Sequence, residues 1–99
     1  MKNMIGFVFV TTSVGHEREV YNIFVGIPEI VETYPVLGEY DFILKIKAGN
    51  LTGLQYILFK KIKRAQNVLY AELFPAADFE SIKSKKDGKT QSLPDKKWN

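Results

Sequence analysis

The residues with the clearest capacity for chemistry lie in the run Val36-Leu37-Gly38-Glu39-Tyr40-Asp41, between two apolar segments. Gly38 can take a positive φ at no steric cost, so the chain can reverse there and present Asp41 at the start of the following segment. A carboxylate held at such a turn can bind an ammonium group. Because ordinary turns share this composition, a binding site and a structural turn are both open interpretations at this point.

Other candidate reactive groups are few. The chain has no cysteine, which excludes disulfides, thiol nucleophiles and thiolate metal sites. Its one histidine, His16, cannot form a histidine-rich metal site. No serine or threonine has an evident histidine partner, Glu39 and Asp41 lie on a short turn beside open solvent, and no glycine-rich phosphate loop occurs. We expect no enzymatic activity, metal or cofactor; an unrecognised isomerase or oxygenase of the small dimeric αβ-barrel type is the alternative.

Length and charge suggest one small domain with a basic extension. The 99 residues carry a net charge of +3, but residues 1–78 contain eight basic and eight acidic residues, so the excess comes from the lysine-rich residues 79–99. Such a tail is usually solvated surface. No apolar stretch is long enough to span a bilayer and no signal-peptide pattern is present, so we expect a soluble, cytoplasmic protein.

Hydrophobic periodicity supplies the elements that position the turn. It predicts, in order, strand, helix, strand, strand, helix and strand, over residues 5–12, 15–27, 29–37, 41–48, 50–62 and 67–75. Asn50 is the expected N-cap of the second helix. The residues expected to face inward are Val20, Ile23, Phe24 and Ile27 in the first helix and Leu51, Leu54, Ile57, Leu58 and Ile62 in the second.

This βαββαβ order predicts an α+β, ferredoxin-like fold: a four-stranded antiparallel sheet of order 4-1-3-2 with two helices on one face. Pro35 cannot donate to a strand ladder, which places its strand at the edge. The first strand carries Phe7 and Phe9 on one side and valines on the other, so a second surface must cover the face without helices. We expect a homodimer packed sheet to sheet, a dimeric αβ-barrel.

Two further surface features allow more than one interpretation. Tyr56 and Phe59 lie off the inward stripe of the second helix and either serve a contact between dimers or are two partly exposed aromatics. The run Gly6–Val10 is superficially similar to an RNA-binding motif that belongs on the third strand of this topology. Here the third strand lacks the stacking aromatic pair, and residues 1–78 are neutral, so RNA binding is disfavoured.

The series Ile30–Ile46 resembles the central hairpin of the effector-binding domain of Lrp/AsnC transcriptional regulators, the RAM domain (regulation of amino-acid metabolism). Gly38 and Asp41 match its G-x-x-D signature. The similarity extends to the first strand, to the helix start at residues 15–20, to the helix from Leu51 and, more weakly, to Ile82-Lys83 and Ser92-Leu93-Pro94. It covers residues 5–94.

The resemblance implies a stand-alone form of the domain, because members generally begin with a helix-turn-helix and this domain begins almost at Met1. Direct sequence-specific DNA binding is therefore not expected. In the family, dimers assemble into tetramers of dimers and bind amino acids in clefts between dimers. By position, residues 37–40 (Leu37, Gly38, Glu39 and Tyr40) would form backbone and wall, and Asp41 would meet the ligand's ammonium group.

One departure from the family concerns the last strand, where small hydroxyl residues usually help to hold the ligand's carboxylate. The corresponding positions here are Ala71 and Leu73, whose side chains cannot donate a hydrogen bond. Two hypotheses follow. The domain either senses an amino acid or related metabolite, modulating transcription indirectly, or it is a ligand-free interaction module that associates with full-length Lrp/AsnC regulators.

Overall fold

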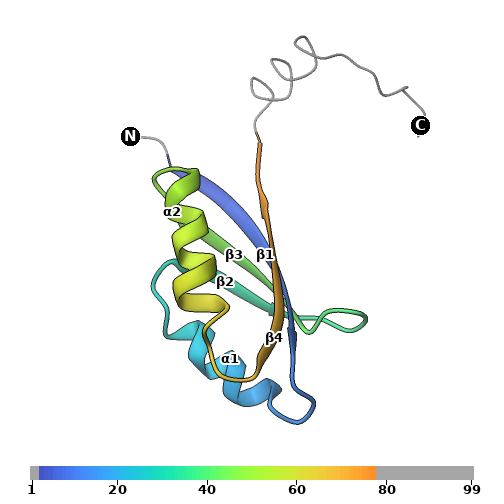
Figure 1. Cartoon of the computed structure of the whole chain (residues 1–99). Coiled ribbons are helices and arrows are strands. Elements are labelled where there is room, and N and C mark those ends of the chain that lie inside the picture. The colour runs from blue at the N-terminus through green and yellow to red at the C-terminus, as the bar shows by residue number, and fades with distance from the viewer. Residues whose placement is uncertain (1–2, 78–99) are drawn as a thin grey trace, which may run out of the picture.

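A computed structural model describes residues 3–77 of the chain. Figure 1 shows the ribbon. The elements, in chain order, are β1 (Met4–Thr12), α1 (Glu17–Val25), β2 (Ile30–Pro35), β3 (Phe42–Ala48), α2 (Leu51–Tyr56), the π-helical segment η1 (Ile57–Ile62) and β4 (Val68–Pro75). The βαββαβ order predicted from the sequence is therefore confirmed.

The four strands form one antiparallel sheet in the order β2-β3-β1-β4. This is the predicted order, with β1 between two neighbours and the proline-bearing β2 at an edge. Val8 is paired with Leu44 on β3 and with Leu73 on β4, which fixes the faces of these strands relative to one another. Alternate residues of β1 therefore point to opposite sides of the sheet.

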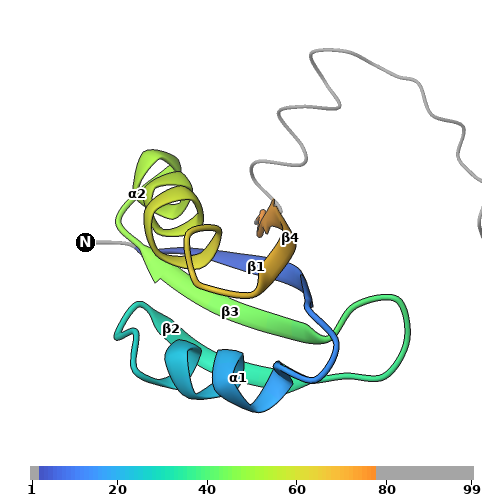
Figure 2. The ribbon, with the colours of Figure 1, turned by 60° about the horizontal axis from the view of Figure 1, so that its bottom comes forward.

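One face of the sheet packs against the helices and forms the core. Val8 and Val10 are fully buried there, as are Val20 and Phe24 of α1 and Leu54 of α2. Figure 2 shows α1 running alongside β2 and α2 lying over β1 and β3. The opposite face, which we call the open face, is covered by no helix of the described residues.

Helix α1 is short and its buried stripe is narrower than predicted. Val20 and Phe24 are buried, whereas Ile23, expected to face inward, is 39% exposed. Ile23 lies about 100° around the helix from Phe24, at the margin of the stripe. Ile27 lies beyond the end of the helix and packs against the core from there.

The second helix begins as predicted but changes its winding. Asn50 caps it, because its side-chain oxygen accepts a hydrogen bond of 2.8 Å from the Gly53 N–H. From Ile57 the helix continues as the π-helical η1 instead of a regular α-helix. Leu51, expected to face inward, is 42% exposed, because it is the first helical residue and adjoins the exposed Gly49-Asn50 cap.

Some predictions concern residues outside the described range. These are the lysine-rich extension over residues 79–99 and the two C-terminal stretches that resemble the family, Ile82-Lys83 and Ser92-Leu93-Pro94. Within residues 3–77, no helix is long and apolar enough to cross a membrane.

Candidate functional site

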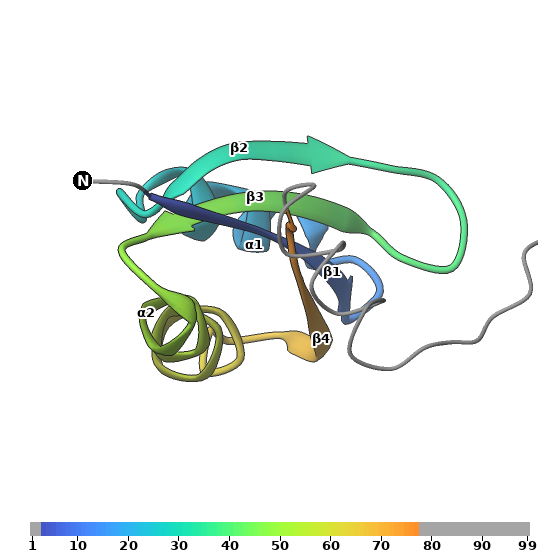
Figure 3. The same ribbon diagram turned by 90° about the horizontal axis from the view of Figure 1, so that it is seen from above.

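The loop between β2 and β3 spans residues 36–41 and extends beyond the other strand ends (Figure 3). The Val36 N–H donates a hydrogen bond of 3.0 Å to the Asp41 carbonyl and so closes the loop at its base. Gly38 has a φ of +129° and open space around it. A side chain at that position would be strained by the backbone conformation, which is the reason for a glycine here.

Asp41 links this loop to the end of β1. Its backbone N–H donates to the Val10 carbonyl at 2.8 Å. Its carboxylate oxygen Oδ2 accepts from the Thr12 N–H at 2.7 Å and from the Thr12 hydroxyl at 3.2 Å. Among the described residues, the other oxygen, Oδ1, accepts no hydrogen bond, so it can still receive an ammonium donor.

The remaining predicted loop residues differ in their exposure to solvent. Leu37 is fully exposed and Glu39 is exposed. Tyr40 instead packs edge-to-face on Phe9, with ring centroids 5.3 Å apart, and stacks on Tyr70. In one protomer the tip of the loop is therefore open to solvent, whereas Tyr40 holds the base of the loop against the sheet.

Ala71 and Leu73 lie on the helix-covered face of β4. They are paired with Val10 and Val8 of β1, and Ala71 is 4% exposed within the core. Leu73 packs against the core. The structure thus brings residues 37–41 together in one loop, whereas the side chains of Ala71 and Leu73 contribute to packing under the helices.

The open face carries an aromatic cluster, of which the sequence pattern indicated only Phe7 and Phe9. Besides the predicted Phe7 and Phe9, it contains Tyr40, Tyr70 and Phe74. Phe9 packs edge-to-face on both Tyr40 and Phe74. The alternation of Tyr70, Glu72 and Phe74 in β4 was the signal that could have identified the additional members.

Two tyrosines on or beside this face interact with neighbouring carboxylates. The Tyr34 hydroxyl donates to Glu32, and this hydrogen bond raises the pKa of Tyr34. The Tyr70 hydroxyl donates to Glu72 at 2.9 Å and its pKa is raised for the same reason. Both phenols therefore remain neutral donors at physiological pH.

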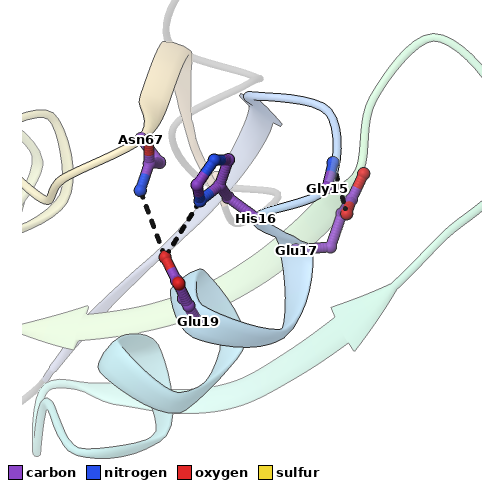
Figure 4. A network of polar contacts seen from close by, with 5 residues as sticks. All are labelled: Gly15, His16, Glu17, Glu19 and Asn67. Carbon is purple, nitrogen blue, oxygen red and sulfur yellow. Dashed lines mark hydrogen bonds and ion pairs between the residues drawn. The ribbon is translucent and has the colours of Figure 1, made fainter.

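A second polar network lies at the start of α1 (Figure 4). The Gly15 N–H donates to Glu17 Oε1 at 3.1 Å. The carboxylate of Glu19 lies 3.0 Å from His16 Nδ1 and accepts a bond of 3.3 Å from the Asn67 side chain. These contacts tie α1 to the turn before β4. Within residues 3–77, no three His, Cys, Asp or Glu side chains are grouped as metal ligands.

Comparison with known proteins places this fold and loop in a family. Residues 5–77 match the model of the Lrp/AsnC ligand-binding domain. The regulator FL11 of Pyrococcus furiosus, an HTH-type transcriptional regulator, is 36% identical over 56 residues, which cover 57% of this chain and 37% of that protein. The chain thus matches little more than a third of the length of this curated relative.

Solved structures give the same result for the fold. The crystal structure of FFRP-DM1 matches with a TM-score of 0.71 and 31% identity, covering 75% of this chain and 99% of that one. The regulator NMB0573 of Neisseria meningitidis, solved in complex with L-Met, matches with a TM-score of 0.67 and 17% identity, covering 77% of this chain and 51% of that one. The chain belongs to the Lrp/AsnC ligand-binding domain family.

Proposed function

We propose that this chain is a cytoplasmic effector-sensing domain that binds an amino acid or a related metabolite at the Gly38–Asp41 loop, between dimers. Binding shifts its assembly, or its association with full-length Lrp/AsnC regulators, and so modulates transcription indirectly, without DNA recognition or catalysis by this domain.

The observation that carries the proposal is the state of the Asp41 carboxylate. One oxygen is held by Thr12, which fixes the orientation of the group, and Oδ1 accepts no hydrogen bond from the described residues. A carboxylate that is already held in one rotamer loses little conformational entropy when its free oxygen binds an ammonium donor. Family membership and the L-Met complex of a structural neighbour support an amino acid as the donor.

The proposed partner on the open face is a second copy of the chain. Phe7 and Phe9 are only half-buried in one protomer, and Tyr70 and Phe74 are 48% and 47% exposed. A contiguous aromatic face of this kind is usually covered in solution. Sheet-to-sheet packing in a homodimer covers it and leaves the β2–β3 loops at the rim, where further dimers can meet them.

Light scattering coupled to size-exclusion chromatography tests this assembly. Phe9→Glu places a charge in the aromatic cluster and is expected to give a monomer. Phe59→Glu is the matched control, because Phe59 is a 53% exposed aromatic on η1, remote from the open face; it is expected to retain at least the dimer. A wild-type monomer, or a dimeric Phe9→Glu, contradicts the proposed interface.

Ligand binding is tested by thermal unfolding in the presence of each amino acid in turn. A ligand at 100 times its dissociation constant stabilises the native state by about 2.7 kcal/mol. We expect a shift with at least one amino acid, its loss in Asp41→Asn, and its retention in Glu19→Gln, which removes the same charge at the start of α1. No shift with any amino acid contradicts the sensor.

The alternative function is a ligand-free module that joins the assemblies of full-length regulators. The specific observation in its favour is that Ala71 and Leu73 have no hydroxyl and pack under the helices. Mixing the chain with a full-length Lrp/AsnC regulator and measuring the mass of the complex tests it. A mixed assembly whose stability no amino acid changes favours the module over the sensor.

A further inference from the structure

A shallow pocket of about 540 Å³, largely open to solvent, lies between the start of α1 and the adjoining ends of β2 and β3, lined by Glu17, Arg18, Tyr21, Pro35 and Phe42. Small-molecule sites have volumes of about 300–1,000 Å³ and combine an apolar lining with a few polar groups. This pocket has both features. It is formed by one protomer and does not use the carboxylate of Asp41.

Aromatic and apolar groups form the base of the pocket. Phe42 is 2% exposed and is fixed by Phe24, which packs edge-to-face on it at 5.8 Å. Tyr21 stacks on Phe42 with ring centroids 6.3 Å apart and planes 28° from parallel. Because Tyr21 is only half-buried and Pro35 is exposed, an apolar group can bind against this surface without displacing core residues.

The polar groups of the pocket are a carboxylate and a guanidinium of opposite charge. They occupy successive positions of α1, both line the pocket, and no ion pair forms between them. Among the described residues, Arg18 lies within ion-pair distance of no carboxylate. Glu17 accepts one hydrogen bond, from the Gly15 N–H to Oε1, and its other oxygen accepts none from the described residues.

Arg18 is exposed to solvent, as is Glu17, and its position in α1 is slightly unfavourable. It lies in the first turn of the helix, where the helix dipole disfavours a cation. A bound carboxylate would compensate this cost twice, by pairing with the guanidinium and by interacting favourably with the helix N-terminus. A simple anion would, however, also meet the repulsion of Glu17, whereas a ligand with an ammonium group beside its carboxylate satisfies both charges.

We propose that this pocket is a second ligand site, for a small zwitterion with an apolar or aromatic side chain. The ligand's carboxylate pairs with Arg18 and its ammonium group with Glu17, and its side chain packs on the accessible parts of Tyr21 and Pro35, over the buried Phe42. The proposal goes beyond the loop site, because it requires neither Asp41 nor a neighbouring dimer.

Titration of the full chain with L-phenylalanine, followed by amide NMR shifts, tests the site. We expect shifts centred on residues 17–21 and on Phe42. Phenethylamine and 3-phenylpropionate each lack one of the two charges and should bind about tenfold or more weakly. Equal binding of either analogue overturns the zwitterion assignment, and the absence of shifts at residues 17–21 overturns the site.

Variants distinguish this pocket from the loop site. Arg18→Gln should weaken binding about tenfold or more, whereas Arg64→Gln, which removes the same charge from an exposed residue after η1, should not. Loss of L-phenylalanine binding in Asp41→Asn but not in Arg18→Gln overturns the pocket and leaves the proposed function standing. Loss in Arg18→Gln but not in Asp41→Asn supports the pocket and locates L-phenylalanine away from the loop.

Discussion

Replacing Asp41 by alanine removes the acceptor that holds the end of β1. The bond from the Thr12 N–H is short, 2.7 Å, and Thr12 is 3% exposed, so water cannot readily replace the lost acceptor. A hydrogen bond to a charged group contributes about 1.5–3 kcal/mol. The hydroxyl contact at 3.2 Å is longer and the hydroxyl can rotate to another acceptor. We therefore expect Asp41→Ala to lower the free energy of unfolding by about 2–3 kcal/mol.

Urea unfolding at one fixed protomer concentration measures this loss, since association would otherwise change the apparent stability. Asp41→Asn should cost about 1 kcal/mol, because the amide oxygen still accepts from Thr12 but carries no charge. Thr12→Val removes the hydroxyl bond alone, so a double-mutant cycle with Asp41→Ala isolates that contact. An Asp41→Ala protein within about 0.5 kcal/mol of wild type, with an unchanged m-value, would refute the reasoning.

Three further predictions concern stability. Gly6→Ala should destabilise by about 1–3 kcal/mol in urea unfolding, because its Cβ would lie 2.8 Å from Leu73 Cδ1; an unchanged midpoint would mean that the core relaxes freely. The hydrogen bond and charge of Lys61 lower the pKa of Glu29 from its usual 4.5, so the pair stabilises above that value and its contribution is lost as the pH falls through the lowered pKa. The difference in unfolding free energy between wild type and Glu29→Gln should be a few tenths of a kcal/mol near neutral pH, because the Lys61 and Glu29 side chains are both about a third exposed. This difference should shrink near pH 3. A difference that stays constant with pH counts against the pair. Asn50→Ala should lower the melting midpoint through a loss of about 1 kcal/mol, with Asn50→Ser largely retaining it.

Strand order and the edge position of β2 could be predicted because several independent signals agreed. The βαββαβ order allows few right-handed topologies, and Pro35 fits only an edge. The prediction of which helical residues face the core was less accurate. Ile23 lies at the margin of the apolar stripe of α1 and Leu51 at the start of α2, and both positions adjoin solvent.

The faces on which the β4 side chains lie, and the contact of Asp41 with Thr12, both depend on the register between strands. This sequence specifies that register weakly. In β4, Tyr70 and Phe74 alternate with Ala71 and Leu73, so both faces read as apolar and a shift of one residue would exchange them. The bond from Thr12 to Asp41 spans 29 positions and exists only because β1 pairs with β3 in one particular alignment. No local pattern encodes such a contact.

Adjacent residues of the loop have different structural partners. Asp41 holds the end of β1 through Thr12, whereas Tyr40 packs on Phe9 and Tyr70 of the open face. The base of the loop therefore cannot move without disturbing either the carboxylate bond or the aromatic contacts. A ligand bound at the proposed Asp41 site would act one residue from Tyr40, whose side chain belongs to the proposed dimer face. Coupling between two sites requires an element whose position both of them influence, and in the proposed assembly residues 40–41 would be that element.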